Sequence, residues 1–171
     1  MPTVDPAARH LVTALLVIAT FSGCGGSDQP IGSGSTKQTC RTPHFIGSGP
    51  PDWRRLSTHL GPFGLTPSRD HRYQTGPREP DGLFHVKTPA LVEGHRPVEL
   101  QVPPAERNRI GLEVVKPGGP YARVIFVPCQ SKPRTIWGAG LVLRDRKPVT
   151  LGVRVGSAWI GAIRLSRIVR R

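Results

Sequence analysis

The stretch VTLGVRV, residues 149–155, decides the fold class, because its aliphatic residues alternate with other residues without interruption. Four aliphatic side chains occupy every second position, and Thr150 and Arg154 lie between them. Successive side chains of a β-strand point to opposite faces of the sheet. The pattern therefore predicts a strand with one buried face and one face toward solvent.

Similar segments recur at short intervals after Asp81, with turn-forming residues between them. They are LFHVK (83–87), PVELQV (97–102), RIGLEVV (109–115), YARVIFV (121–127), GLVLR (140–144) and AWIGAIRLSRIV (158–169). The alternation in the last segment slips near Ser166, which predicts a β-bulge. About seven strands without an intervening helical period predict an all-β fold. We expect a small antiparallel β-sandwich of the immunoglobulin-like kind, with a small barrel as the alternative.

The part of the domain that precedes these strands has an irregular sequence. The chain contains 20 glycines and 19 prolines, and residues 40–80 are rich in both. Interior prolines disrupt helices and central strands. The apolar residues of this part are expected to pack onto the domain as loop anchors or as a short helix: Trp53, Leu56, Leu60, Phe63 and Leu65. A single domain is thus predicted over 40–171, irregular over 40–80 and stranded over 81–171.

Residues 1–23 have the organisation of a signal peptide. Arg9 precedes the uncharged apolar run LVTALLVIATF (11–21), and the small residues Ser22 and Gly23 follow it. A bilayer-spanning helix needs about 20 apolar residues, so the run has the length of a secretory segment instead. We therefore exclude 1–23 from the fold.

The four residues FSGC (21–24) resemble the lipobox of bacterial lipoproteins, with Phe21 at a position where that family usually has an aliphatic residue. The resemblance implies that the Cys24 thiol receives a diacylglycerol and that Cys24 becomes the first, acylated residue. Residues 24–39 are Gly/Ser-rich and are expected to form a flexible tether. The protein would then lie at the extracytoplasmic face of the cell membrane. The alternatives are a secreted protein and a protein held by a single N-terminal membrane anchor.

Cys40 and Cys129 remain if Cys24 carries lipid. Their number is even, and a compartment outside the cytoplasm permits disulfides. A Cys40–Cys129 bridge would close a loop of about 90 residues. In the chain-entropy model such a loop stabilises the folded state by up to about 4–5 kcal/mol. The alternative is two separate free thiols.

The stretch 126–156 is similar to small exported proteins of unknown function from actinobacteria. Those proteins combine a strand that ends in cysteine, a turn of the Trp-Gly-Gly kind and two closing strands. In this chain WGAG (137–140) occupies the position of the turn. The resemblance implies an exported β-domain and no particular activity.

The chain is strongly basic, with a formal net charge of +13. After Cys129 it has ten Lys/Arg residues against the single acid Asp145, a net charge of +9. Such a segment attracts polyanions, so a patch for anionic lipid or cell-wall polymer is predicted at its end. The patch consists of Arg164, Arg167, Arg170 and Arg171. The alternative is a solvated strand face that reflects an arginine-rich composition. Nucleic acid is not expected, because the protein is predicted to be exported and the final basic segment RLSRIVRR (164–171) has no interleaved aromatic residues for stacking.

No stretch of the sequence has the spacing of a catalytic or metal-binding motif. The histidines are scattered, without the paired spacing that places two imidazoles on one helical face. We expect no catalytic residues, no metal and no cofactor. The sequence therefore predicts a monomeric cell-envelope lipoprotein that acts as a non-catalytic binding or structural module. An exported enzyme, or an enzyme accessory that acts on envelope material, is the alternative.

Overall fold

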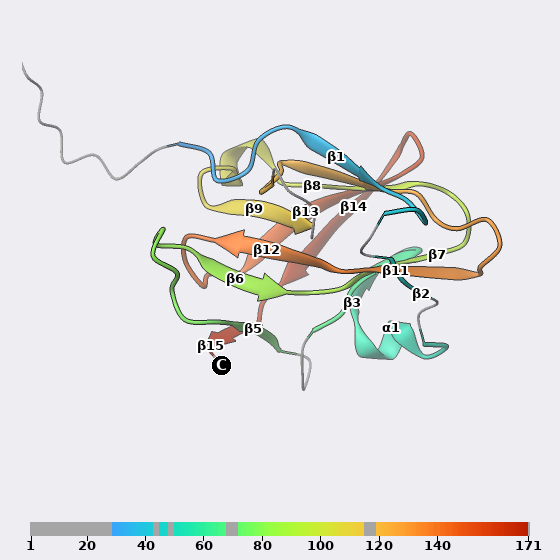
Figure 1. The fold of residues 1–171 in the computed structure, drawn as a ribbon, viewed down its shortest axis with the longest axis horizontal. Coiled ribbons are helices and arrows are strands. Elements are labelled where there is room, and N and C mark those ends of the chain that lie inside the picture. The colour runs from blue at the N-terminus through green and yellow to red at the C-terminus, as the bar shows by residue number, and fades with distance from the viewer. Residues whose placement is uncertain (1–28, 43–44, 48–49, 68–71, 115–118, 171) are drawn as a thin grey trace, which may run out of the picture.

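The computed structural model describes residues 29–42, 45–47, 50–67, 72–114 and 119–170. These residues form fifteen short strands, the helix α1 (Trp53–Leu56) and the 3-10 helix η1 (Pro104–Glu106), as Figure 1 shows. The predicted all-β fold is confirmed. The strands are more numerous than the seven predicted, because several have only three or four residues and alternate too briefly to be recognised.

The first sheet has the strand order β1-β10-β8-β13-β14. Its strands are β1 (Ser35–Gln38), β10 (Arg123–Phe126), β8 (Val98–Gln101), β13 (Val149–Val155) and β14 (Ala158–Leu165). β1 pairs with β10 in parallel, and the other three pairs are antiparallel. One face of this sheet is buried, and Figure 1 shows the sheet along one side of the molecule.

The remaining strands form two further sheets of five strands each. The second sheet contains, in order, β2 (Phe45–Gly47), β11 (Arg134–Trp137), β7 (Ala90–Glu93), β4 (Phe63–Leu65) and β3 (Thr58–Leu60). The third contains β15 (Ile168–Arg170), β5 (Tyr73–Thr75), β6 (Phe84–Lys87), β12 (Ala139–Leu143) and β9 (Ile110–Val114).

Two long antiparallel segments run through both of these sheets. β6 continues into β7 after the pair Thr88 and Pro89, and β11 continues into β12 after Gly138. The Thr88 amide donates to the Ala139 carbonyl at 3.0 Å, so the two segments stay hydrogen-bonded where they bend. Figure 1 shows both segments running the length of the molecule. The second and third sheets thus form one bent layer that packs against the first sheet, and the sandwich is confirmed.

The core lies between these layers, and aromatic side chains connect them. The ring centroids of Phe126 on β10 and Trp137 on β11 are 5.3 Å apart, and those of Phe126 and Phe63 on β4 are 5.7 Å apart. All three are fully buried. The indole N–H of Trp137 donates to the backbone carbonyl of Thr39 at 3.1 Å. Each large aromatic removes about 150–250 Å² from water, so this cluster contributes much of the cohesion between the layers.

Every strand predicted after Asp81 is present, and the end of the chain differs in one respect. The slip near Ser166 is not a bulge, because β14 ends at Leu165 and β15 starts at Ile168 in another sheet. The register irregularity of β14 lies nearer its start, between Val153 and Arg154 of the partner strand. The alternation slips at Ser166 because the buried side of the chain changes when it crosses between layers.

The tether predicted over 24–39 is too long at its C-terminal end, because residues 35–38 form β1. The amide of Ile31 already donates to the Arg107 carbonyl at 2.8 Å. A Cβ atom on Gly32 would lie 2.6 Å from the Tyr121 carbonyl oxygen, so this glycine permits close packing where the composition suggested flexibility.

Residues 40–80 are less irregular than predicted, since they contain β2, β3, β4, β5 and α1. The expected short helix is confirmed as α1, and Trp53, Phe63 and Leu65 are buried as expected. Leu56 is an exception, with 38% of its surface exposed. It lies at the last position of α1, and the buried residue of that helix is Trp53.

Candidate binding surface

The outer face of the first sheet is built from residues that the strand register places in rows. One row crosses all five strands through Lys37, Ile125, Glu99, Arg154 and Trp159. The next row runs through Ser35, Arg123, Gln101, Gly152 and Ala162, and Thr150 pairs with Arg164 beside it. Directly paired residues share one face of a sheet, so these side chains form a single surface, which we call the outer face.

The outer face carries four cations and one carboxylate. The cations are Lys37, Arg123, Arg154 and Arg164, and the carboxylate is Glu99. A long ion pair of 3.8 Å joins Arg123 and Glu99. Lys37 and Arg164 are exposed, and neither makes a hydrogen bond or ion pair with another described residue. The face therefore has an excess of positive charge that is available to an anion.

A tryptophan lies at one edge of this face. Trp159 is 54% exposed, whereas Trp53 and Trp137, the other tryptophans of the chain, are 1% and 0% exposed. Its ring lies against Gly152 of the neighbouring strand, because a Cβ atom at position 152 would be 2.6 Å from Trp159 Cη2 and 2.7 Å from Cζ3. The absence of a side chain at Gly152 thus lets the indole lie against the sheet.

The β13–β14 hairpin contains a β-bulge directly after Trp159. Val153 pairs with Gly161 and Arg154 pairs with Trp159, so Ile160 is the extra residue of β14. Gly161 has a φ of +131°, a conformation that favours glycine. As a result Trp159 faces outward and Ile160 turns toward the opposite layer, where it packs against the core.

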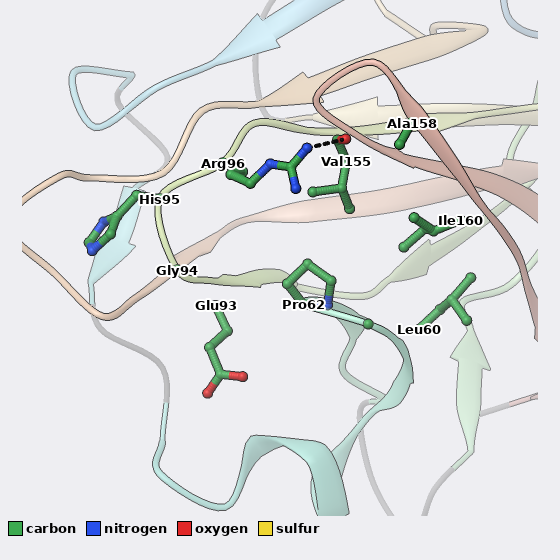
Figure 2. A pocket seen from close by; sticks show the side chains of 10 residues that line it. Leu60, Pro62, Glu93, Gly94, His95, Arg96, Val155, Ala158 and Ile160 are labelled. Atoms are coloured by element: carbon green, nitrogen blue, oxygen red, sulfur yellow. Dashed lines mark hydrogen bonds between the residues drawn. The ribbon is translucent and has the colours of Figure 1, made fainter.

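A pocket of about 520 Å³ opens beside Ile160 (Figure 2). It lies between the β13–β14 hairpin, the turn between β3 and β4, and the loop between β7 and β8. Apolar side chains form its wall: Leu60, Pro62, Val155, Ala158 and Ile160. A wall of this kind suits an apolar group rather than an ion.

The rim of this pocket carries titratable and charged groups that do not converge. Arg54 Nη2 donates to Glu93 Oε2 at 2.6 Å, and this hydrogen bond lowers the pKa of Glu93 against the opposing effect of partial burial. Arg96 donates to the backbone carbonyl of Val155 at 3.2 Å. Figure 2 shows the Glu93 carboxylate and the His95 ring directed away from the apolar wall. This geometry does not assemble an acid–base pair in the pocket.

Two other clusters of ionisable groups lie in the bent layer and its connections. His85 Nδ1 on β6 and Glu113 Oε2 on β9 are 3.1 Å apart across β12, which lies between these strands in the third sheet. Arg109 Nη1 donates to Asp145 Oδ1 at 2.8 Å, and the same guanidinium binds Glu106, so it ties η1 to the segment after β12. In the described ranges, no group of three or more His, Cys, Asp or Glu side chains has the arrangement of a metal site.

The cysteines predicted to form a disulfide lie at disulfide distance. Cys40 follows β1 and Cys129 follows β10, and their sulfur atoms are 2.07 Å apart with a Cα–Cα distance of 5.5 Å. The parallel pairing of β1 with β10 brings the two residues together. Cys24 lies outside the described residues. Among those that are described, no helix has the length and apolar character required to cross a bilayer.

The C-terminal arginines that the structure describes do not lie on one strand. Arg164 lies on β14 in the outer face, and Arg170 lies on β15 in the third sheet. Arg167 is exposed in the link between these strands, and Arg171 lies outside the described residues. The outer face therefore shares Arg164 with the predicted patch, and its other cations come from strands distant in sequence.

Sequence reasoning missed Lys37, Arg123 and Trp159 as members of one surface. Their grouping depends on the strand order, which the alternation pattern does not contain. The sequence does contain a signal for the place of Trp159, because Gly152 is a glycine at an outward position of an otherwise regular strand. Such a glycine often marks a place where another group approaches the backbone closely.

No protein family, curated protein or solved structure matches this chain. The functional argument therefore rests on the residues and on their geometry.

Proposed function

We propose that this protein is a bacterial cell-envelope lipoprotein whose β-sandwich is a non-catalytic binding module. A lipid on Cys24 would hold it at the extracytoplasmic face of the membrane, and residues 25–30 would act as the tether. The module would act as a monomer and bind an anionic component of the envelope, either lipid headgroups or wall polymer. Secretion, or retention by a single N-terminal anchor, is the alternative for its location.

The observation that carries this proposal is the excess of cations on the outer face. Across its five strands this face has one carboxylate, Glu99, and four cations, which are Lys37, Arg123, Arg154 and Arg164. Charges gathered on one regular face produce an attractive potential for a polyanion, even where each single contact is weak. The ion pairs of Arg109 and Arg54, in contrast, join neighbouring structural elements and leave little free charge.

A second candidate is an exported enzyme or an enzyme accessory that acts on envelope material. The open apolar pocket favours it, because Glu93, His95 and Arg96 lie on the rim. The binding module has more support, since the Glu93 carboxylate is already bound by Arg54 and His95 is directed away from the apolar wall. A general base must instead reach a substrate held in the cavity.

Binding to a polyanion should weaken steeply as salt is added. We expect the purified protein to lose about tenfold or more of its affinity for polygalacturonate between about 0.05 and 0.3 M NaCl, because each neutralised charge releases counterions. The double variant Lys37→Gln/Arg164→Gln should bind several-fold more weakly at low salt. The measurement is equilibrium binding to the immobilised polymer.

The matched control is Arg55→Gln/Lys147→Gln, which removes the same net charge from two exposed positions away from the outer face. It should bind nearly as the unmodified protein does. Equal losses in the two double variants would show that total charge matters and that the outer face has no special role. A flat salt response would exclude the electrostatic proposal.

Replacing Cys24 with alanine should release the protein from the membrane. Two acyl chains anchor stably, since each buried methylene contributes ~0.8 kcal/mol. We expect the unmodified chain, produced in a bacterium, to partition into the detergent phase and Cys24→Ala into the aqueous phase. The intact mass should show acyl groups on a chain that begins at Cys24. Detergent-phase Cys24→Ala of full length would point instead to an uncleaved anchor.

A further inference from the structure

We propose that Trp159 is a stacking platform for a sugar ring, and that the outer face binds an anionic polysaccharide. Arg154 and Arg164 would hold the acidic groups of the polymer on either side of the stacked ring. This inference rests on the proposed function, because it names the ligand class of the same surface.

The first argument is the position of the indole. The Cζ3 and Cη2 atoms of the Trp159 ring lie close to Gly152, and the side chain is still 54% exposed. A large aromatic residue that is half exposed leaves apolar surface in contact with water, and a ligand that covers this surface gains the free energy of its burial. The other two tryptophans of the chain are buried, so this exposure is not a general property of its aromatic residues.

The second argument is that the ring is already held in a binding orientation. Gly152 removes the side chain that would push the indole away from the sheet, and the bulge at Ile160 turns Trp159 outward. A ligand that stacks on a ring held in place loses less conformational freedom than one that must first order it. The C–H face of a pyranose ring is apolar and nearly flat, so it matches a planar aromatic surface.

The third argument is the set of side chains around the ring. Arg154 is the direct register partner of Trp159, and Thr150 and Arg164 form the pair beside Gly152 and Ala162. Gln101 lies beside Gly152 on the other side. Guanidinium groups bind carboxylates or phosphates, and hydroxyl and amide groups bind sugar hydroxyls. A neutral polysaccharide would leave the two guanidinium groups without a partner, and an acidic one would use all of these groups.

The same arrangement fits a membrane surface less well. Interfacial tryptophans place their rings at the level of lipid headgroups together with other apolar side chains. On the outer face the rows add only Ile125, which is half-buried, and the remaining positions are polar, charged or small. Single-stranded nucleic acid also stacks and carries charge. It is disfavoured by the proposed extracytoplasmic location, and the test below includes it.

The experiment measures binding of five probes to the purified protein at low salt. Polygalacturonate supplies sugar rings and carboxylates, polyacrylate supplies carboxylates without rings, and dextran supplies rings without charge. Phosphatidylglycerol vesicles and oligodeoxythymidylate report the other two ligand classes. Trp159 is also a natural reporter, because the two buried tryptophans are shielded from a soluble quencher. We expect polygalacturonate, and not polyacrylate, to protect the indole fluorescence from acrylamide.

The decisive variants are Trp159→Ala and Gly152→Ala. Trp159→Ala should weaken polygalacturonate binding about tenfold, as expected for the loss of one stacked aromatic contact, and should leave polyacrylate binding unchanged. Gly152→Ala keeps the indole and the charge but displaces the ring, so it should produce most of the same loss. Leu56→Ala removes the other large apolar side chain that is exposed among the described residues, and it should have no effect on either polymer.

The outcomes separate this inference from the function on which it rests. If both polyanions bind with similar affinity and Trp159→Ala changes neither, the cationic surface stands and the sugar platform is wrong. If no polyanion binds, the proposed function itself fails. Tighter binding to oligodeoxythymidylate, or insertion of Trp159 into vesicles with a blue-shifted emission, would overturn the polysaccharide assignment. Thermal melting of each variant shows whether a loss of binding reflects a loss of folding.

Discussion

Trp137→Ala is expected to lower the free energy of unfolding by about 3–5 kcal/mol, the range for removing a fully buried tryptophan. Trp137 has no exposed surface and contacts Phe126 of the opposite layer. Its indole N–H also donates to the Thr39 carbonyl, so alanine leaves a cavity and removes one of the hydrogen bonds that this carbonyl accepts beside β1. A domain of this size has about 5–15 kcal/mol of stability in total, so the variant should approach the unfolding threshold.

Urea denaturation followed by circular dichroism measures this loss. Trp159→Ala is the matched control, since it removes the same side chain from an exposed position. We expect a cost below about 1 kcal/mol for the control. Similar midpoints for the two variants would contradict the placement of Trp137 at the centre of the core.

Removal of the Cys40–Cys129 link is expected to cost about 2–5 kcal/mol. The two residues are 89 positions apart, so the link restricts a large part of the unfolded chain. In the folded state Cys129 is buried, and its amide donates to Thr135 Oγ1 at 3.0 Å. The double variant Cys40→Ser/Cys129→Ser, made in a Cys24→Ala background, should unfold at a lower urea concentration.

Treatment with a reductant provides the control for this prediction. Reduction should destabilise the Cys24→Ala protein by a similar amount and should not change the double-serine variant. The Cys24→Ala background leaves only the pair to be counted, so the denatured, unreduced protein should have no free thiol. Two free thiols before reduction would contradict the bridge.

The sequence predicted the part of the fold that depends on local alternation. VTLGVRV coincides with β13, and PVELQV and RIGLEVV contain β8 and β9. In each of these strands a buried aliphatic residue alternates, wholly or in part, with a more exposed one. The physical reason is that successive side chains of a strand point to opposite faces, so a strand buried on one face has an apolar residue at every second position.

The parts that could not be predicted depend on distant pairing. β1 consists of Ser, Thr, Lys and Gln, which have no apolar period, and it exists because it pairs with β10. β6 and β7 belong to different sheets, although they are nearly continuous in sequence. The bend at Thr88 and Pro89 produces this change, and an X-Pro pair predicts a break without its direction.

The candidate surface shows the same limit. The predicted arginines were chosen because they are close in sequence, and the structure places Arg164 on β14 and Arg170 on β15, in different sheets. The outer face instead collects Lys37, Arg123 and Arg154 from three other strands. Only the pair Gly152 and Trp159 is close enough in sequence to be found by inspection, as a glycine in a regular strand facing an aromatic residue across a hairpin.

The two parallel pairs have a consequence for the order in which the domain folds. β1 pairs with β10, and β15 pairs with β5, so each end of the chain joins a strand from the interior of the sequence. Closing such long loops costs entropy before the contacts are gained, and topologies rich in distant contacts fold on a millisecond-to-second scale. The antiparallel hairpin of β13 and β14 closes a short loop and can form early. The third sheet receives β15 from residues 168–170 and β5 from residues 73–75. A chain delivered from its N-terminus therefore cannot complete this sheet before residues 168–170 are available.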